Sequence, residues 1–256
     1  MKLLLTGFAA ACVLVTSAAA YAHDFFLIPD QFTSSKTGSQ NVQASVGSNF
    51  PTPENVVTAD RVDRVFAVGA GNPRLTVAGP GAKALNLRFM DTKRGTVIAA
   101  VKTKDRDVEY ADDRIPIILE EYRVSPAAAA AIAALPKPRI LKVSSRRFAK
   151  TLMCIQQCND RAVATRPLGT ELEFVSVARG TDHFRLLSQG RLLANYPVDL
   201  VTADAKRRHM MTDGKGEAHL PTDARGSLML FAAVMTPPVA GDRFTLDLST
   251  LTFSRP

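Results

Sequence analysis

The stretch RFTLDLSTLTF (residues 243–253) begins with the alternation of a β-strand. Phe244, Leu246 and Leu248 recur at every second position, and polar residues stand between them. Because successive side chains of a strand point to opposite faces of a sheet, this spacing gives one apolar face and one polar face. The stretch therefore predicts a strand with a buried face near the C-terminus.

Similar short stretches recur along most of the chain. Residues 41–47, NVQASVG, alternate in the same way, and residues 171–177, ELEFVSV, carry apolar side chains on both faces. Further strands are expected over residues 62–68, 74–79, 85–89, 96–102, 191–201 and 227–235. Many short strands separated by turn residues predict a mainly β protein of two β-sandwich lobes, immunoglobulin-like or transthyretin-like.

One helix interrupts this pattern, over the alanine-rich stretch that follows Ser125. Ser125 is a good N-cap, Pro126 suits the first helical position, and Pro136 ends the apolar run. Because this helix is too apolar to stand alone in water, we expect it to pack on a sheet. A second helical turn is expected at residues 119–121.

The first 22 residues have the pattern of a signal peptide. Lys2 precedes an uncharged apolar run over residues 3–20, and small residues flank two cleavage positions, after Ala20 and after Ala22. No later apolar run approaches the roughly 20 residues that span a bilayer. We therefore expect a periplasmic protein with no transmembrane anchor after signal removal. The remainder divides into an N-terminal β-rich domain (23–166) and a C-terminal β-sandwich (167–256).

Charge and motifs narrow the functional classes. The formal net charge is +8, but the basic residues are scattered, so for an exported chain we expect no nucleic-acid partner. The sequence carries no glycine-rich phosphate loop, nucleophile elbow or metalloprotease motif. These observations favour a protein that is not an enzyme.

Several stretches, in this order along the chain, resemble the DUF4198 family of exported proteins: AHDFFLIP (22–29), ILEEY (118–122), RFAKTL (147–152), PLGTELEFV (167–175) and MTDGKGEAHLP (211–221). The resemblance implies a periplasmic β-rich protein without established enzymatic activity. Some relatives are described as accessories to nickel or cobalt uptake, which implies a membrane metal transporter as partner. Phe26 stands where the family usually has Trp, and CIQQCND (154–160) matches no family pattern.

His23 is the first candidate metal ligand. Cleavage after Ala22 makes His23 the first residue, whose free α-amine and ring Nδ1 can chelate one ion. Cleavage after Ala20 leaves Tyr21-Ala22-His23, in which the amine, two amides and the imidazole suit square-planar nickel or copper. Asp24 can add an oxygen or orient the ring. In the alternative reading, His23 is only a polar residue leading into the strand that follows.

A second candidate ligand set lies in RRHMMTDGKGEAHLP (residues 207–221). A turn with Gly216 in the left-handed position places Asp213 opposite Glu217. In that register His209, Met211 and His219 share one face, and imidazole with thioether is compatible with copper. In the alternative reading, one methionine belongs to the core and the histidines lie at the surface.

Cys154 and Cys158 are the two cysteines left after signal removal. In an oxidising compartment the simplest interpretation is a disulfide, provided that the chain turns between them.

The leading hypothesis is a non-enzymatic protein that binds nickel, cobalt or copper for uptake or homeostasis. The competing hypothesis is an immunoglobulin-like interaction module that binds a carbohydrate or another envelope protein.

Overall fold

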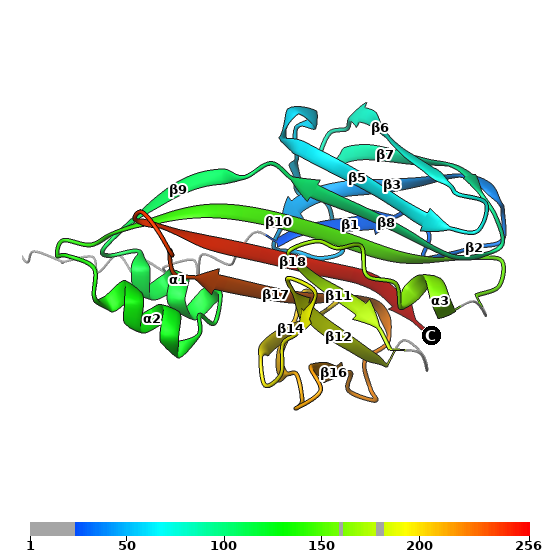
Figure 1. The fold of residues 1–256 in the computed structure, drawn as a ribbon. Coiled ribbons are helices and arrows are strands. Elements are labelled where there is room, and N and C mark those ends of the chain that lie inside the picture. The colour runs from blue at the N-terminus through cyan, green and yellow to red at the C-terminus, as the bar shows by residue number, and fades with distance from the viewer. Residues whose placement is uncertain (1–23, 159–160, 178–181) are drawn as a thin grey trace, which may run out of the picture.

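The computed structural model describes residues 24–158, 161–177 and 182–256. Strands account for most of this part of the chain, so the prediction of a mainly β protein is confirmed. Its helices are short: η1 (Ala59–Arg61), α1 (Ile115–Glu121), α2 (Pro126–Ala133) and α3 (Arg161–Ala164). Figure 1 shows two long strands, β10 and β18, running side by side through the length of the molecule.

A nine-stranded sheet forms the centre of the fold. In spatial order its strands are β15 (Arg207–Met211), β14 (Pro197–Thr202), β17 (Gly226–Thr236), β18 (Arg243–Arg255), β10 (Ile140–Ile155), β8 (Gly95–Thr103) and β5 (Val62–Gly69). Two further strands, β2 (Thr33–Ser34) and β9 (Arg106–Ala111), pair with β10. Strands β10 and β18 are parallel, whereas β17 and β18 are antiparallel. The alternating stretch 243–253 thus lies within a central strand.

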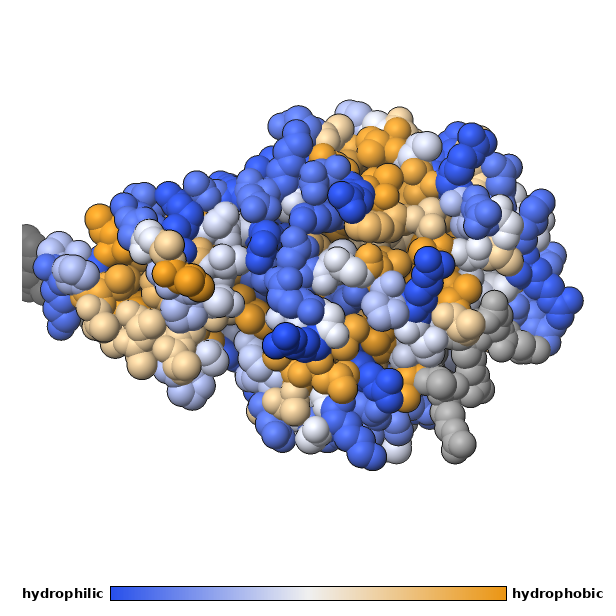
Figure 2. All heavy atoms as spheres, viewed as in Figure 1, coloured by the Kyte–Doolittle hydropathy of each residue, from blue (hydrophilic) through white to orange (hydrophobic). Residues whose placement is uncertain are grey.

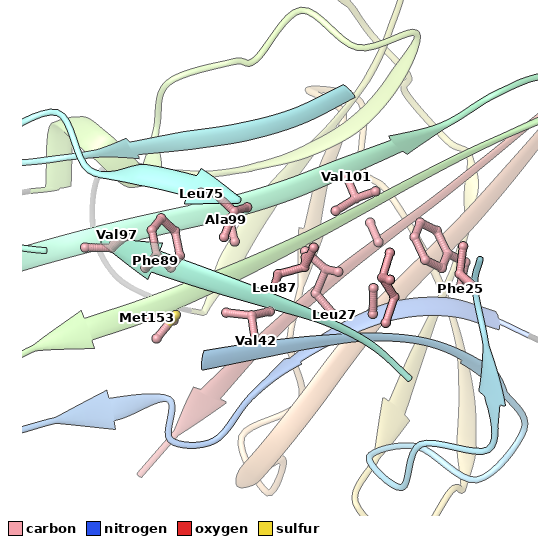
Figure 3. Close-up of a cluster of buried hydrophobic side chains, with 14 of the residues drawn as sticks. Phe25, Leu27, Val42, Leu75, Leu87, Phe89, Val97, Ala99, Val101 and Met153 are labelled. Atoms are coloured by element: carbon pink, nitrogen blue, oxygen red, sulfur yellow. The ribbon is translucent and has the colours of Figure 1, made fainter. Parts of the chain in front are cut away.

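A five-stranded sheet packs on one part of the central sheet. It contains β1 (Asp24–Pro29), β3 (Gly38–Gly47), β4 (Asn55–Val56), β6 (Arg74–Pro80) and β7 (Leu85–Thr92). The close-up in Figure 3 shows the core between the two sheets, where Leu27, Leu87 and Phe89 of the smaller sheet meet Val97 and Met153 of the larger. Burial of these apolar surfaces holds the first lobe together.

A four-stranded sheet covers another part of the central sheet. Its strands are β11 (Leu172–Ser176), β12 (His183–Ser188), β13 (Arg191–Leu192) and β16 (Glu217–His219). Phe174 and Phe184 of this sheet share a buried cluster with Leu200 of β14, Leu230 of β17 and Phe253 of β18. This cluster is the core of the second lobe.

The two helices after β9 form a third core at the far end of the long strands. Ile118 of α1 and Ile132 of α2 pack with Phe244 and Leu246 of β18. The predicted start of α2 is confirmed, because the Ser125 hydroxyl accepts a hydrogen bond from the Ala128 N–H (3.3 Å). Figure 2 shows a moderately hydrophobic surface over these helices.

The expected boundary between residues 166 and 167 does not divide the strands into separate sheets. It does separate the largest parts of two buried clusters, but strands from both sides of it belong to the same nine-stranded sheet. The parallel pairing of β10 with β18 joins the halves along ten residue pairs, from Lys142 and Arg243 to Thr151 and Thr252. The two lobes therefore share the nine-stranded sheet.

A buried ion pair also joins the halves. The Lys150 Nζ on β10 donates to Glu173 Oε2 on β11 (2.8 Å) and to the Phe174 carbonyl (2.7 Å). Glu173 further accepts hydrogen bonds from the backbone N–H groups of Leu168 and Gly169. These residues lie in RFAKTL and PLGTELEFV, two of the stretches that carry the family resemblance. Glu173 thus fixes the connection that enters the second lobe.

Candidate metal centre

Two histidines face each other across neighbouring strands of the four-stranded sheet. His183 of β12 is directly opposite His219 of β16, and their ring centroids lie 4.2 Å apart. Directly opposed residues of antiparallel strands bring their Cβ atoms to about 5 Å. On the other face of the same strands, Phe184 and Ala218 are buried in the core of the second lobe. The packing of these two residues therefore sets the side of the sheet on which the imidazoles lie.

Glu217 completes a group of three ligands that we call the histidine cluster: His183, Glu217 and His219. Each residue offers one ligand atom, and the three atoms all lie within 4.8 Å of one another. Glu217 is two residues before His219 on β16, so both side chains point to the same face. Two ligands of one transition metal ion lie at most about 4 Å apart. Small side-chain rotations therefore bring the three atoms to bonding distance.

Asp213 orients the cluster from the preceding turn. Its Oδ1 accepts hydrogen bonds from the backbone N–H groups of Lys215 (2.8 Å) and Glu217 (2.9 Å), and its Oδ2 lies 3.0 Å from His219 Nε2. The backbone N–H of Glu217, and then the His219 ring, lower the pKa of Asp213 to about 2. The ionised Asp213 carboxylate is hydrogen-bonded to Nε2 of His219, so Nδ1 of the same imidazole is the nitrogen that can bind a metal.

Arg185 opposes cation binding. Its Nε and Nη2 both donate to Glu217 Oε1, at 3.0 and 2.9 Å. The guanidinium thus places a positive charge beside one of the three candidate ligands. Both hydrogen bonds go to Oε1, so Oε2 is the atom that Glu217 can turn toward an ion.

The predicted turn is formed, but the predicted hairpin register is not. Gly216 has φ +70°, and the Asp213 N–H donates to the Glu217 carbonyl (2.9 Å), as expected. Beyond the turn, however, β15 pairs with β14 in the nine-stranded sheet, and β16 pairs with β12 in the four-stranded sheet. The expectation that Met211 lies opposite His219 is therefore wrong.

His209 and Met211 have other neighbours. The Nδ1 of His209 lies 2.7 Å from Oδ1 of Asp199, a buried carboxylate that also receives hydrogen bonds from Arg123 and Arg207. Met211 is exposed, and its Sδ lies 3.8 Å from Arg123 Nη2. Of the predicted set, the structure places His219 alone in the histidine cluster.

His23 lies outside the described residues, whereas Asp24 is buried at the start of β1. The Arg207 Nη2 donates to Asp24 Oδ2 (2.6 Å). Burial raises the pKa of Asp24 to about 6, although Arg207 opposes this shift. Strand β1 is held on the central sheet by the hydroxyls of Thr250 and Thr252, which donate to the carbonyls of Phe25 and Leu27. Asp24 is thus already part of a buried ion pair.

Cys154 and Cys158 form a disulfide, with their Cα atoms 5.5 Å apart. Cys154 is near the end of β10, and the chain turns after it through Gln156, which has φ +61°. This turn provides the change of direction that a bond between residues four apart requires.

Sequence reasoning missed two members of the histidine cluster. No local pattern marks His183 as a ligand, and the sequence indicates Glu217 only as the residue opposite Asp213. Their approach depends on the pairing of β12 with β16, which are distant in the sequence, and no local pattern indicates that pairing. The two-residue spacing of Glu217 and His219 was the one available signal.

The fold and the histidine cluster define a mainly β protein with a group of nitrogen and oxygen ligands in which both histidines are exposed. The chain belongs to the DUF4198 family, described as a domain of unknown function, whose model matches residues 20–236. No curated protein matches the chain. In the part of the chain that the structure describes, no helix is long and apolar enough to cross a membrane.

Proposed function

We propose that this protein is a periplasmic, non-enzymatic accessory protein that binds a transition metal ion at His183, Glu217 and His219. The observation that carries the proposal is the convergence of two imidazoles and a carboxylate within 4.8 Å. Imidazole is a ligand for nickel, cobalt and copper, and a carboxylate oxygen is compatible with the same ions. The signal-peptide pattern of residues 1–22 supports export to the periplasm.

The exposure of the two imidazoles suits a protein that transfers its ion. The His219 side chain is 50% exposed, and His183 is exposed as well. Three protein ligands leave at least one coordination position open, which is typical of sites that exchange a ligand rather than of closed structural sites. An accessory that supplies a membrane metal transporter needs such a site, because the receiving protein must reach the ion.

The first experiment is a calorimetric titration of the exported chain with Ni²⁺, Co²⁺ and Cu²⁺. We expect one ion per chain with a dissociation constant of about 1 µM or tighter for at least one metal. His183→Ala and His219→Ala should each weaken this binding by at least about tenfold. His209→Ala is the matched control. His209 is also exposed at the surface, but its ring nitrogen Nδ1 contacts the Asp199 carboxylate and lies outside the histidine cluster.

The same titration separates the histidine cluster from the N-terminal chelate predicted at His23. If His23→Ala abolishes binding while His183→Ala and His219→Ala leave it unchanged, the cluster is not the site. If no ion binds with micromolar affinity, the metal hypothesis fails, and an interaction module becomes the better interpretation.

A substitution of Arg185 tests the same site by an expected gain in metal affinity. Because its guanidinium holds Glu217 Oε1 and repels a cation, Arg185→Gln should tighten metal binding. A purely structural role for the cluster predicts no such gain. Unchanged or weaker binding in Arg185→Gln would contradict the assignment of Glu217 as a ligand.

A further inference from the structure

A cleft of about 480 Å³ opens between the first lobe and the segment that carries the helices. Its walls come from β1, β3, β9 and β10, from the chain around η1, and from Tyr122 at the end of α1. In Figure 1, β9 and β10 extend from the first lobe toward α1 and α2. The cleft lies far along the chain from the histidine cluster and shares no residue with it.

The strand pattern directs basic and aromatic side chains into this cleft. Arg106, Val108 and Tyr110 are alternate residues of β9 and line it together. Arg147 is two residues after Ser145 on β10, and Arg106 pairs with Ser145 across the two strands. Because alternate residues share a face of a sheet, the two strands present arginine and hydroxyl groups on one surface.

The charge of the lining is one-sided. Arg61 joins Arg106 and Arg147 along the walls, and the described residues that line the cleft include no aspartate or glutamate. The acidic residues of β9, Asp107 and Glu109, alternate with the lining residues and are not part of the lining. Guanidinium groups are suited to bidentate recognition of carboxylate and phosphate.

Tyr110 and Tyr122 add hydrogen-bond donors. Burial raises the pKa of both phenols, that of Tyr122 strongly. A phenol with its ordinary pKa near 10 is already protonated at neutral pH, so both hydroxyls can donate to an anion.

Part of the cleft lining is apolar. Phe25, Val46 and Val57 line it beside the polar groups. A volume of about 480 Å³ lies within the range of sites for small organic molecules, which combine apolar walls with a few placed polar groups. We propose that this cleft binds a small organic anion that carries a carboxylate or phosphate group on an apolar body.

Four probes test the two parts of this proposal. Hexanoate and hexyl phosphate carry both the anionic group and the apolar body, 1-hexanol carries only the apolar body, and inorganic phosphate carries only the charge. Calorimetry measures affinity, and NMR of ring-labelled tyrosine reports the location. Tyr110 and Tyr122 should shift on binding, whereas Tyr196, which donates to the Ala233 carbonyl elsewhere in the fold, should not.

Two variants and a matched control test the role of charge. Arg106 is exposed, so Arg106→Gln should fold normally and should weaken binding about tenfold or more. Arg147→Gln should weaken binding as well. Arg191→Gln, on the exposed strand β13 of the second lobe, makes the same change in net charge and should leave affinity unchanged.

The proposal is supported if either hexyl anion binds, shifts both cleft tyrosines and loses affinity in Arg106→Gln but not in Arg191→Gln. Comparison of hexanoate with hexyl phosphate then identifies the preferred anionic group. Equal binding of 1-hexanol would overturn the role of charge, and equal binding of inorganic phosphate would overturn the role of the apolar body. Equal weakening by Arg191→Gln, or no tyrosine shift with any probe, would overturn the site.

Discussion

The substitution Glu173→Gln tests how the two halves of the chain are held together. Glu173 Oε2 accepts from Lys150 Nζ (2.8 Å), and the side chains of Lys150 and Glu173 are only 7% and 3% exposed. Glutamine keeps the shape of glutamate and an oxygen for the N–H groups of Leu168 and Gly169, but it removes the negative charge. Lys150 would then be a buried ammonium without an anionic partner.

The expected cost follows from burial. Removing one partner of a buried ion pair destabilises a protein by about 3–5 kcal/mol, because the remaining charge stays desolvated. Burial already lowers the pKa of Lys150, and Glu173 opposes that shift. Without Glu173 the pKa falls further below that of the unfolded chain, so the folded variant binds fewer protons than the unfolded one. Its stability deficit should therefore shrink as the pH rises toward about 10.

Urea unfolding followed by far-UV circular dichroism measures this cost, since the chain has no tryptophan. Asp91→Asn is the matched control. It also removes one carboxylate charge, but the Arg74–Asp91 pair is 72% and 60% exposed and should contribute at most about 1 kcal/mol. Asparagine tolerates the positive φ of 61° at that position. A loss below about 1 kcal/mol in Glu173→Gln would refute the inference that this pair fastens the second lobe to β10.

Three further changes probe separate features. Burial raises the pKa of Asp24 to about 6, so the folded protein binds this proton more tightly than the unfolded chain does. This difference stabilises the fold fully below about pH 4, and the stabilisation is lost as the pH rises through about 6. The unfolding free energy of the wild type minus that of Asp24→Asn should thus fall by about 2 kcal/mol between pH 4 and 7.5 in urea titrations, and a flat difference would contradict the shift. Replacing Cys154 and Cys158 by serine opens a loop of sequence separation 4 and should cost about 2 kcal/mol in thermal unfolding; no loss would show that the bond does not constrain the chain. Tyr196→Phe removes the hydrogen bond to the Ala233 carbonyl (2.8 Å) and should cost about 1 kcal/mol without changing metal affinity; altered metal binding would contradict the separation of the two regions.

Local patterns were sufficient for many elements of the fold. Alternation at residues 243–253 predicts part of β18, and Ser125 with Pro126 predicts the start of α2. The sixteen-residue strand β10 was not predicted, because Arg146 and Lys150 interrupt its apolar positions. Lys150 is nonetheless buried, since Glu173 neutralises it from another strand. A pattern of hydrophobicity cannot identify a charge that a distant residue compensates.

The arrangement of the sheets depends on pairings that are remote in the sequence. The parallel pairing of β10 with β18 joins the two sandwich-like lobes through one shared sheet. The same limitation applies to the candidate site. The chemistry of Asp213 and Gly216 predicts the turn, but the strands that leave it enter different sheets, so His219 meets His183 and not Met211. Turn chemistry determines local geometry, whereas core packing determines the partner strand.

Anomalous diffraction from crystals of the protein loaded with Ni²⁺ or Cu²⁺ tests the central claim most directly. The account predicts an anomalous peak about 2 Å from a ring nitrogen of His183 and of His219, with a Glu217 oxygen at a similar distance. A peak at the N-terminal residues alone, or a histidine cluster without a peak in fully loaded crystals, would contradict it.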